Sequence, residues 1–277
     1  MAVVFRRGPT RQVEILTWDL TTNEVIAGQW LKGRIYERRC DLSPAGDFLI
    51  YFAAKYETDL RTWTAISRPP YLTALALWPK GDAWGGGGLF DSDRRIRLNH
   101  RPDEMKQESW FRLAPSMRIV PLGEVSGWGE DNPIHHIRLV RDGWTWIDNG
   151  STTQMHSYES SPWITYEPPL RYRRALGTHK RPITLEMSME GLGERDGSWY
   201  VLTYRLVDGE ELIRDIGRAD WADAAPDGGL LLGRDGRLLR LDIDAIDEWA
   251  SAEFREIAHL GDHRFEPRTA PPEALSW

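Results

Sequence analysis

The sequence predicts an all-β fold of the β-propeller class, with five or six blades and one short appended helix. Strand-like segments dominate the chain, a Pro-x-Gly turn recurs in it, and only one stretch has helical spacing. The 277 residues are 41% hydrophobic and 28% charged, a globular composition with enough apolar side chains for a core. We therefore expect a single propeller-like domain over residues 1–277.

The strands are predicted from short runs of β-branched, aromatic and aliphatic residues that are bounded by Gly, Pro, Asn or Asp. These runs cover residues 3–7, 13–18, 48–54, 73–78, 134–140, 198–206, 229–234 and 237–243. The helix is predicted over residues 242–260, where apolar side chains recur at intervals of three and four behind Asp244 as a cap.

The blades are predicted from three copies of one turn. The copies are Pro44-Ala45-Gly46, Pro79-Lys80-Gly81 and Pro226-Asp227-Gly228. Proline presets φ for the turn and glycine tolerates a positive φ, so each copy is expected to join two strands of a blade. After the third copy, Asp235-Gly236 predicts a further hairpin.

Two segments carry a resemblance to known repeats. DLSPAGDFLIYFA (41–53) and ADWADAAPDGGLLLGRDGRLLRL (219–241) resemble the repeats of WD40-like and TolB-type β-propellers. Residues 32–55 and 68–90 are also similar to an uncharacterised bacterial protein family. The resemblance implies a rigid scaffold that presents its loops to a partner.

Composition restricts the compartment and the partners. No run approaches the roughly 18 apolar residues of a membrane span, and the N-terminal apolar run is too short for a signal peptide, so we expect a cytoplasmic protein without a membrane partner. Cys40 is the single cysteine, which excludes an intramolecular disulfide. Residues 186–277 hold ten basic and 21 acidic residues, which argues against nucleic-acid binding.

Tryptophan is abundant, with 14 residues, and Trp84 and Trp128 lie in glycine-flanked stretches. Exposed indoles there would anchor a protein partner or stack on a sugar ring. Packing between blades is the alternative. The run of four glycines after Trp84 lacks the residues of a phosphate-binding loop and predicts a flexible turn between strands.

His135 follows two acidic residues in GWGEDNPIHHIRLV, and it is a candidate for contact with a ligand or partner. On the predicted strand His135 and His136 point to opposite faces, so they would not share a metal ion. Ordinary packing is the alternative, and we expect no metal and no cofactor.

The strongest basic feature is LRYRRALGTHKRP, with Arg171, Arg173 and Arg174 as candidate binding residues. On a strand, Arg171 and Arg173 share one face, and Arg174 lies on the other with Tyr172. This surface could hold a phosphate, an acidic peptide or RNA. A charged edge strand is the alternative, as is pairing with the acidic C-terminal third, within the chain or in a homo-oligomer.

Catalysis has weaker support. Asp41 and Asp223 each lie near the start of a repeat strand, where two carboxyls could act in a five-bladed glycan-processing enzyme. Turn capping is the alternative. No nucleophilic serine motif occurs. The sequence therefore favours a non-enzymatic scaffold or binding module for another protein, with a glycan-processing enzyme and an anion-binding propeller as alternatives.

Overall fold

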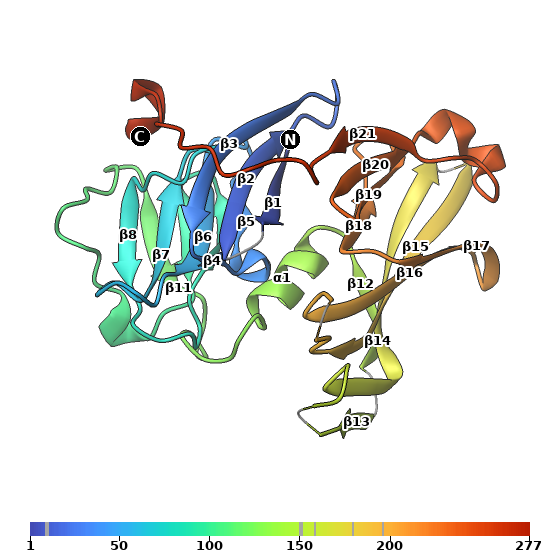
Figure 1. Ribbon diagram of the computed structural model, residues 1–277, viewed down its shortest axis with the longest axis horizontal. Helices are drawn as coiled ribbons and strands as arrows, with labels where there is room; N and C mark the ends of the chain where they lie inside the picture. The colour runs from blue at the N-terminus through green and yellow to red at the C-terminus, as the bar shows by residue number, and fades with distance from the viewer. Residues whose placement is uncertain (9–10, 150–151, 158, 179, 196) are drawn as a thin grey trace. The chain divides into compact units, whose positions relative to one another are not determined.

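The computed structural model describes residues 1–277 except 9–10, 150–151, 158, 179 and 196. The chain divides into two compact units, which are described separately (Figure 1). Unit 1 comprises residues 1–138 and 263–277, and unit 2 comprises residues 139–262. In the described part of the chain, no helix has the length and apolar character needed to cross a membrane. That residues 1–277 form one domain stays a prediction.

The described residues of unit 1 form three sheets. The first is an antiparallel meander of β1 (Ala2–Gly8), β2 (Gln12–Trp18) and β3 (Val25–Lys32). The second has the order β4 (Arg34–Ile35), β6 (Leu49–Ala54), β7 (Thr62–Ser67), β8 (Ala76–Pro79), and β5 (Asp41–Leu42) also pairs with β6. The third has the order β11 (Arg118–Pro121), β10 (Arg95–Leu98), β9 (Gly88–Ser92), in which β10 and β11 are parallel.

In unit 2, the part of the chain that the structure describes forms two sheets. The larger has the order β12 (Thr145–Asn149), β14 (Ile164–Thr178), β15 (Arg181–Leu192), β16 (Tyr200–Asp208), β17 (Glu211–Arg218), and β13 (Thr152–Met155) also pairs with β14. The smaller is β18 (Trp221–Ala224), β19 (Leu230–Arg234), β20 (Arg237–Leu241) and β21 (Arg255–His259).

Short helices complete the chain. The α-helix α1 spans Ile134–Arg141. The 3-10 helices are η1 (Glu37–Arg39), η2 (Pro102–Glu104), η3 (Ile243–Glu248) and η4 (Pro272–Leu275).

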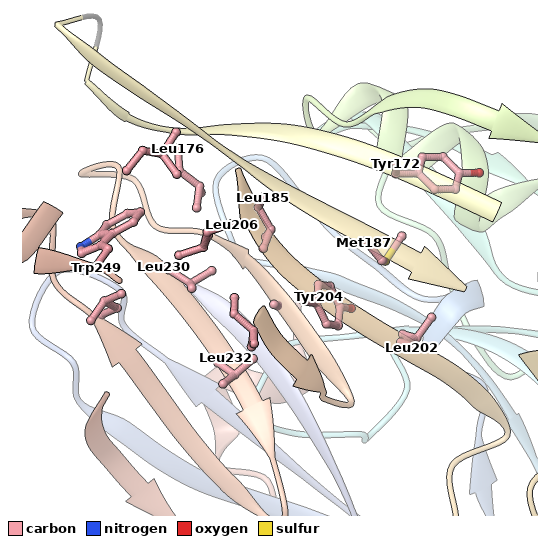
Figure 2. Close-up of a cluster of buried hydrophobic side chains, with 14 of the residues drawn as sticks. Tyr172, Leu176, Leu185, Met187, Leu202, Tyr204, Leu206, Leu230, Leu232 and Trp249 are labelled. Carbon is pink, nitrogen blue, oxygen red and sulfur yellow. The ribbon is translucent and has the colours of Figure 1, made fainter. Parts of the chain in front are cut away.

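The core of unit 2 follows the two-residue period of its strands. Leu185 and Met187 of β15 and Leu202, Tyr204 and Leu206 of β16 are buried in one cluster (Figure 2). Leu230, Leu232 and Trp249 contribute to the same cluster from the smaller sheet and from the segment after η3. Since successive side chains alternate between faces, the residues between them lie on the opposite face of the large sheet.

Two of the three Pro-x-Gly copies form the expected hairpins. Gly46 and Gly228 have φ values of +83° and +91°, in the turns that join β5 to β6 and β18 to β19. Asp235 and Gly236 join β19 to β20, as predicted. The copy at Pro79 differs, because β8 and the next strand, β9, belong to different sheets.

The structure corrects two predicted elements. Residues 242–260 form η3 and then β21 rather than one helix. There the indole of Trp249 is fully buried and donates to the carbonyl of Asp242 over 3.1 Å, while β21 pairs with the otherwise open edge of β20. Tertiary pairing thus overrides helical spacing.

The second correction concerns residues 134–140, which were predicted as a strand and form α1. Pro133 suits the first turn of a helix, and the amides of His135 and Ile137 donate to the carbonyls of Asp131 and Pro133. Ile134 and Ile137 pack together against Leu89 and Leu122.

The all-β propeller-type fold class is confirmed. The described residues form five sheets, within the five or six blades expected, and a single short α-helix. The predicted number of helices is therefore right and the predicted position is wrong.

Candidate functional site

Trp84 and Trp128 lie on two loops of unit 1 that are fastened to each other. The amide of Gly85 donates to the carbonyl of Gly129 over 2.7 Å. The Trp84 and Trp128 side chains are 54% and 60% exposed, and Val125 nearby in the second loop is 60% exposed. We call these three side chains the tryptophan surface.

The buried residue Asn99 is hydrogen-bonded to both of these loops. The side-chain Oδ1 of Asn99 accepts a hydrogen bond from the amide of Gly127 over 2.8 Å, and the Asn99 carbonyl accepts from the amide of Gly86 over 2.7 Å. Asn99 is fully buried. One residue thereby fixes both loops, so the two exposed indoles are carried on a rigid support.

The glycine run after Trp84 is buried rather than flexible. Gly85, Gly86 and Gly87 all have positive φ values, which favour glycine. A Cβ atom on Gly86 would lie 2.3 Å from the ring of Phe52, and one on Gly85 would lie 2.6 Å from the backbone of Gly127. Only glycine permits this close packing, so the prediction of a flexible turn is wrong.

Arg101 restricts Trp128 further. Its guanidinium lies 4.7 Å from the centre of the Trp128 ring, a cation–π contact. The same guanidinium lies 3.7 Å from Asp82 and 3.5 Å from Glu104. One face of the indole is therefore covered by a side chain that is itself held, which lowers the entropy lost when a partner binds.

His135 is placed differently from the two tryptophans. Both ring nitrogens are buried and make no hydrogen bond with any described residue. Burial, together with the charges of Arg38 and Arg138, holds the pKa of His135 well below its usual value. The structure therefore does not bring His135 into the tryptophan surface, and its role in binding stays a prediction.

The three candidate arginines lie on β14 in unit 2, and their side chains separate as the alternation predicts. Arg171 and Arg173 both contact the buried carboxylate of Glu186, at 3.8 and 2.8 Å. Tyr172 packs in the hydrophobic cluster, and Arg174 forms an ion pair with Asp223 of β18. Each of the three guanidinium groups is thus already matched by a carboxylate.

Glu186 organises the charged face of the large sheet. Its side chain is fully buried, and in addition to Arg171 and Arg173 it contacts Arg205 of β16 at 2.5 Å. Arg171 also pairs with Asp148 at 3.2 Å, and Arg173 pairs with Glu210 at 3.0 Å. This network balances its own charges, which leaves no unmatched arginine for an anionic ligand.

Arg205 and the central role of Glu186 are not evident from the sequence alone. Arg173, Glu186 and Arg205 face one another because the registers of three antiparallel strands align them. Register depends on the turn between each pair of strands, and a single sequence does not reveal which charged residues lie opposite each other.

The two carboxyls proposed for glycan chemistry have structural partners. The Asp41 carboxylate accepts a hydrogen bond from the amide of Phe90 over 2.7 Å and is buried in unit 1. Asp223 belongs to unit 2, where burial raises its pKa to about 6 despite the ion pair with Arg174. These contacts fit the capping and pairing alternative and give no specific support to a two-carboxylate mechanism.

Comparisons with protein-family models, with curated proteins and with solved structures find no match to this chain.

Proposed function

We propose that this chain is a non-enzymatic binding module, a WD40-like or TolB-type propeller scaffold of a bacterial cytoplasmic system, and that the tryptophan surface recognises another protein. The observation that carries the proposal is the hydrogen bond from Gly85 to Gly129, which joins the loops bearing Trp84 and Trp128. Both indoles remain more than half exposed on that rigid support. Pre-organised tryptophans are the side chains that most often dominate the free energy of protein association.

Charge near the tryptophan surface specifies the chemistry of the partner. Glu124 and Glu130, in the same loop as Trp128, are exposed. Indole faces and carboxylates both attract cations. We therefore expect the partner to present an apolar side chain beside an arginine or lysine.

The test is affinity capture with the tagged full-length chain from a lysate of its native cells. Trp84→Ala and Trp128→Ala should each reduce recovery of a stoichiometric partner at least about tenfold, because truncating a hot-spot residue costs about 2 kcal/mol or more. Trp110→Ala is the matched control, since Trp110 is 88% exposed in the same unit and is not one of the side chains of the tryptophan surface. Recovery should also fall as salt is raised.

Two results would count against the proposal. One is the absence of any stoichiometric partner for the wild-type chain at low salt. The other is equal recovery by Trp84→Ala, Trp128→Ala and Trp110→Ala, which would place the interface elsewhere.

A further inference from the structure

Unit 2 has a pocket of about 420 Å³ on the face of the large sheet that is opposite the hydrophobic cluster. Its floor is Glu186, and Pro168 and Pro169 at the bulge in β14 form an apolar wall. This volume lies in the range of small-molecule sites. Its lining residues belong to unit 2, whereas the tryptophan surface belongs to unit 1.

Charged groups of opposite sign alternate across the strands of the pocket. Arg171 comes from β14, Glu186 and Glu190 from β15, Arg205 from β16, and Asp215 from β17. The hydroxyl groups of Ser188 and Thr203 lie in the adjacent row, where these two residues are direct cross-strand neighbours. Donors and acceptors are therefore interleaved over the whole surface rather than gathered at two ends.

The hydrogen-bonding capacity of the pocket is not fully used. The Oε1 atom of Glu186 lies beside Arg205 without hydrogen-bond geometry, and it has no hydrogen bond with any described residue. The Nε atoms of Arg171 and Arg205 are buried and also lack a hydrogen bond within the described part of the chain. A ligand group that accepts from these two Nε atoms would pair donors that are now unpaired, which is favourable.

The charge balance argues against a simple anion or cation. Asp148, Glu186 and Glu210 match the guanidinium groups of the network, so an added phosphate would meet no unmatched cation. Glu190 and Asp215 form no salt bridge with a described residue and would repel an anion. A cation would leave the arginine Nε donors unpaired, and a zwitterion needs two separated regions of opposite charge, which the interleaved pattern does not provide.

We propose that this pocket binds a neutral polyhydroxylated ligand, a mono- or disaccharide. A hydroxyl group accepts from one neighbour and donates to another, and such a bridge spans about 5 to 5.5 Å between the two protein atoms. Arg205 of β16 and Asp215 of β17 are direct cross-strand neighbours that form no salt bridge with each other, and since neighbouring strands lie about 4.8 Å apart, a hydroxyl can bridge this guanidinium and this carboxylate. The C–H face of the sugar ring packs on Pro168 and Pro169, and binding brings no net charge into the pocket.

The experiment is calorimetric titration of the full-length chain with glucose, galactose, maltose and trehalose. At least one of them should bind with a Kd on the order of 1 mM, the affinity expected for a ligand of this size. Ser188→Ala and Glu190→Ala should each weaken that binding about fivefold or more, because each removes a polar group that lines the pocket. Glu210→Ala is the matched control: Glu210 belongs to the same ion-pair network, is 85% exposed and does not line the pocket, so Kd should change less than about twofold.

Inorganic phosphate, spermidine and glycine serve as the anionic, cationic and zwitterionic probes. Binding of a saccharide that is lost in Ser188→Ala and kept in Glu210→Ala supports the proposal. Binding of only a charged probe, binding of no probe, or saccharide binding that none of the pocket variants alters would overturn it. Ser188→Ala removes a single hydroxyl group from a half-buried side chain, so this arm remains informative if Glu190→Ala fails to fold.

Discussion

His100 is fully buried and His135 is half-buried in unit 1, and their rings have opposite hydrogen-bonding environments. The Nε2 atom of His100 lies 2.8 Å from the hydroxyl of Thr64, and Nδ1 lies 3.1 Å from the carbonyl of Glu104. Because the Glu104 carbonyl can only accept, Nδ1 carries the proton of the neutral ring, and the unprotonated Nε2 accepts from the Thr64 hydroxyl. The ring nitrogens of His135 have no such partners among the described residues.

Replacing each histidine with leucine should therefore have different effects. His100→Leu leaves Thr64 and the Glu104 carbonyl without their partner and should lower the free energy of unfolding by at least about 2 kcal/mol. His135→Leu removes two unpaired buried nitrogens and should change it by less than about 1 kcal/mol, or raise it. Urea denaturation at pH 7.5 measures both. An equal loss of unfolding free energy in the two variants would contradict this prediction and would mean that the ring nitrogens of His135 are hydrogen-bonded in the folded protein.

At the level of elements, the sequence predicted strands better than helices. The hydrophobic strands β2, β6, β16, β19 and β20 were predicted because an apolar run between turn residues is a local property. The prediction of a helix over residues 242–260 was wrong, because the structure of this segment depends on the burial of Trp249 and on the pairing of β21 with β20. Neither is a local property of the sequence. The pocket could not be predicted for the same reason, since it depends on the register of four strands.

The glycine run offers a test of tight packing at the element scale. Gly81 and Gly86 have φ values of +84° and +80°, but a Cβ atom on Gly81 would meet nothing within 4 Å, while one on Gly86 would overlap the ring of Phe52. Gly81→Ala should therefore cost only the strain of a left-handed backbone, about 1 to 2 kcal/mol. Gly86→Ala should cost at least about 2 kcal/mol more, because the ring or the backbone must shift.

Thermal unfolding of both glycine variants measures this difference. Gly86→Ala should also weaken partner capture, because the shift that the added methyl group forces on the backbone displaces Trp84 two residues away. Gly81→Ala lies in the same loop but adds a methyl group with nothing within 4 Å, so it should leave capture unchanged. Similar stability of the two variants would mean that Phe52 relaxes freely, and the tryptophan surface would then lack the rigid support described above.

At the scale of the whole molecule, each unit has its own buried hydrophobic cluster, and the two units carry groups that respond oppositely to acid. Burial lowers the pKa of His100 in unit 1 to about 4. Burial raises the pKa of Asp223 in unit 2 to about 6. The protonation of one group therefore favours the unfolded state, and the protonation of the other favours the folded state.

Acidification from pH 7.5 to pH 5 should move the unfolding transitions of the two units in opposite directions. The unfolded chain protonates His100 below about pH 6.5 and the folded chain does not, so His100 alone should lower the free energy of unfolding of unit 1 by about 2 kcal/mol by pH 5. His135, whose pKa is also lowered by burial, adds to this loss. Folded unit 2 protonates Asp223 below about pH 6, and the unfolded chain does so only near pH 3.8. The free energy of unfolding of unit 2 should therefore rise by about 1 kcal/mol. Differential scanning calorimetry at the two pH values should resolve two transitions that separate or cross.

Single substitutions assign each shift to its group. Asp223→Asn should abolish the stabilisation of unit 2 by acid and leave the fall of unit 1 unchanged. His100→Gln should reduce the fall of unit 1 by about 2 kcal/mol, leaving the part due to His135, and should not change the stabilisation of unit 2. The comparison stays above pH 5 because Asp82 and Asp242, whose pKa values are lowered by lysine and arginine partners, remain ionised there in both folded and unfolded chains. The prediction fails if the wild-type chain and both variants each show one transition whose temperature falls by the same amount from pH 7.5 to pH 5. The two cores would then unfold as one cooperative structure, and Asp223 would keep an ordinary pKa.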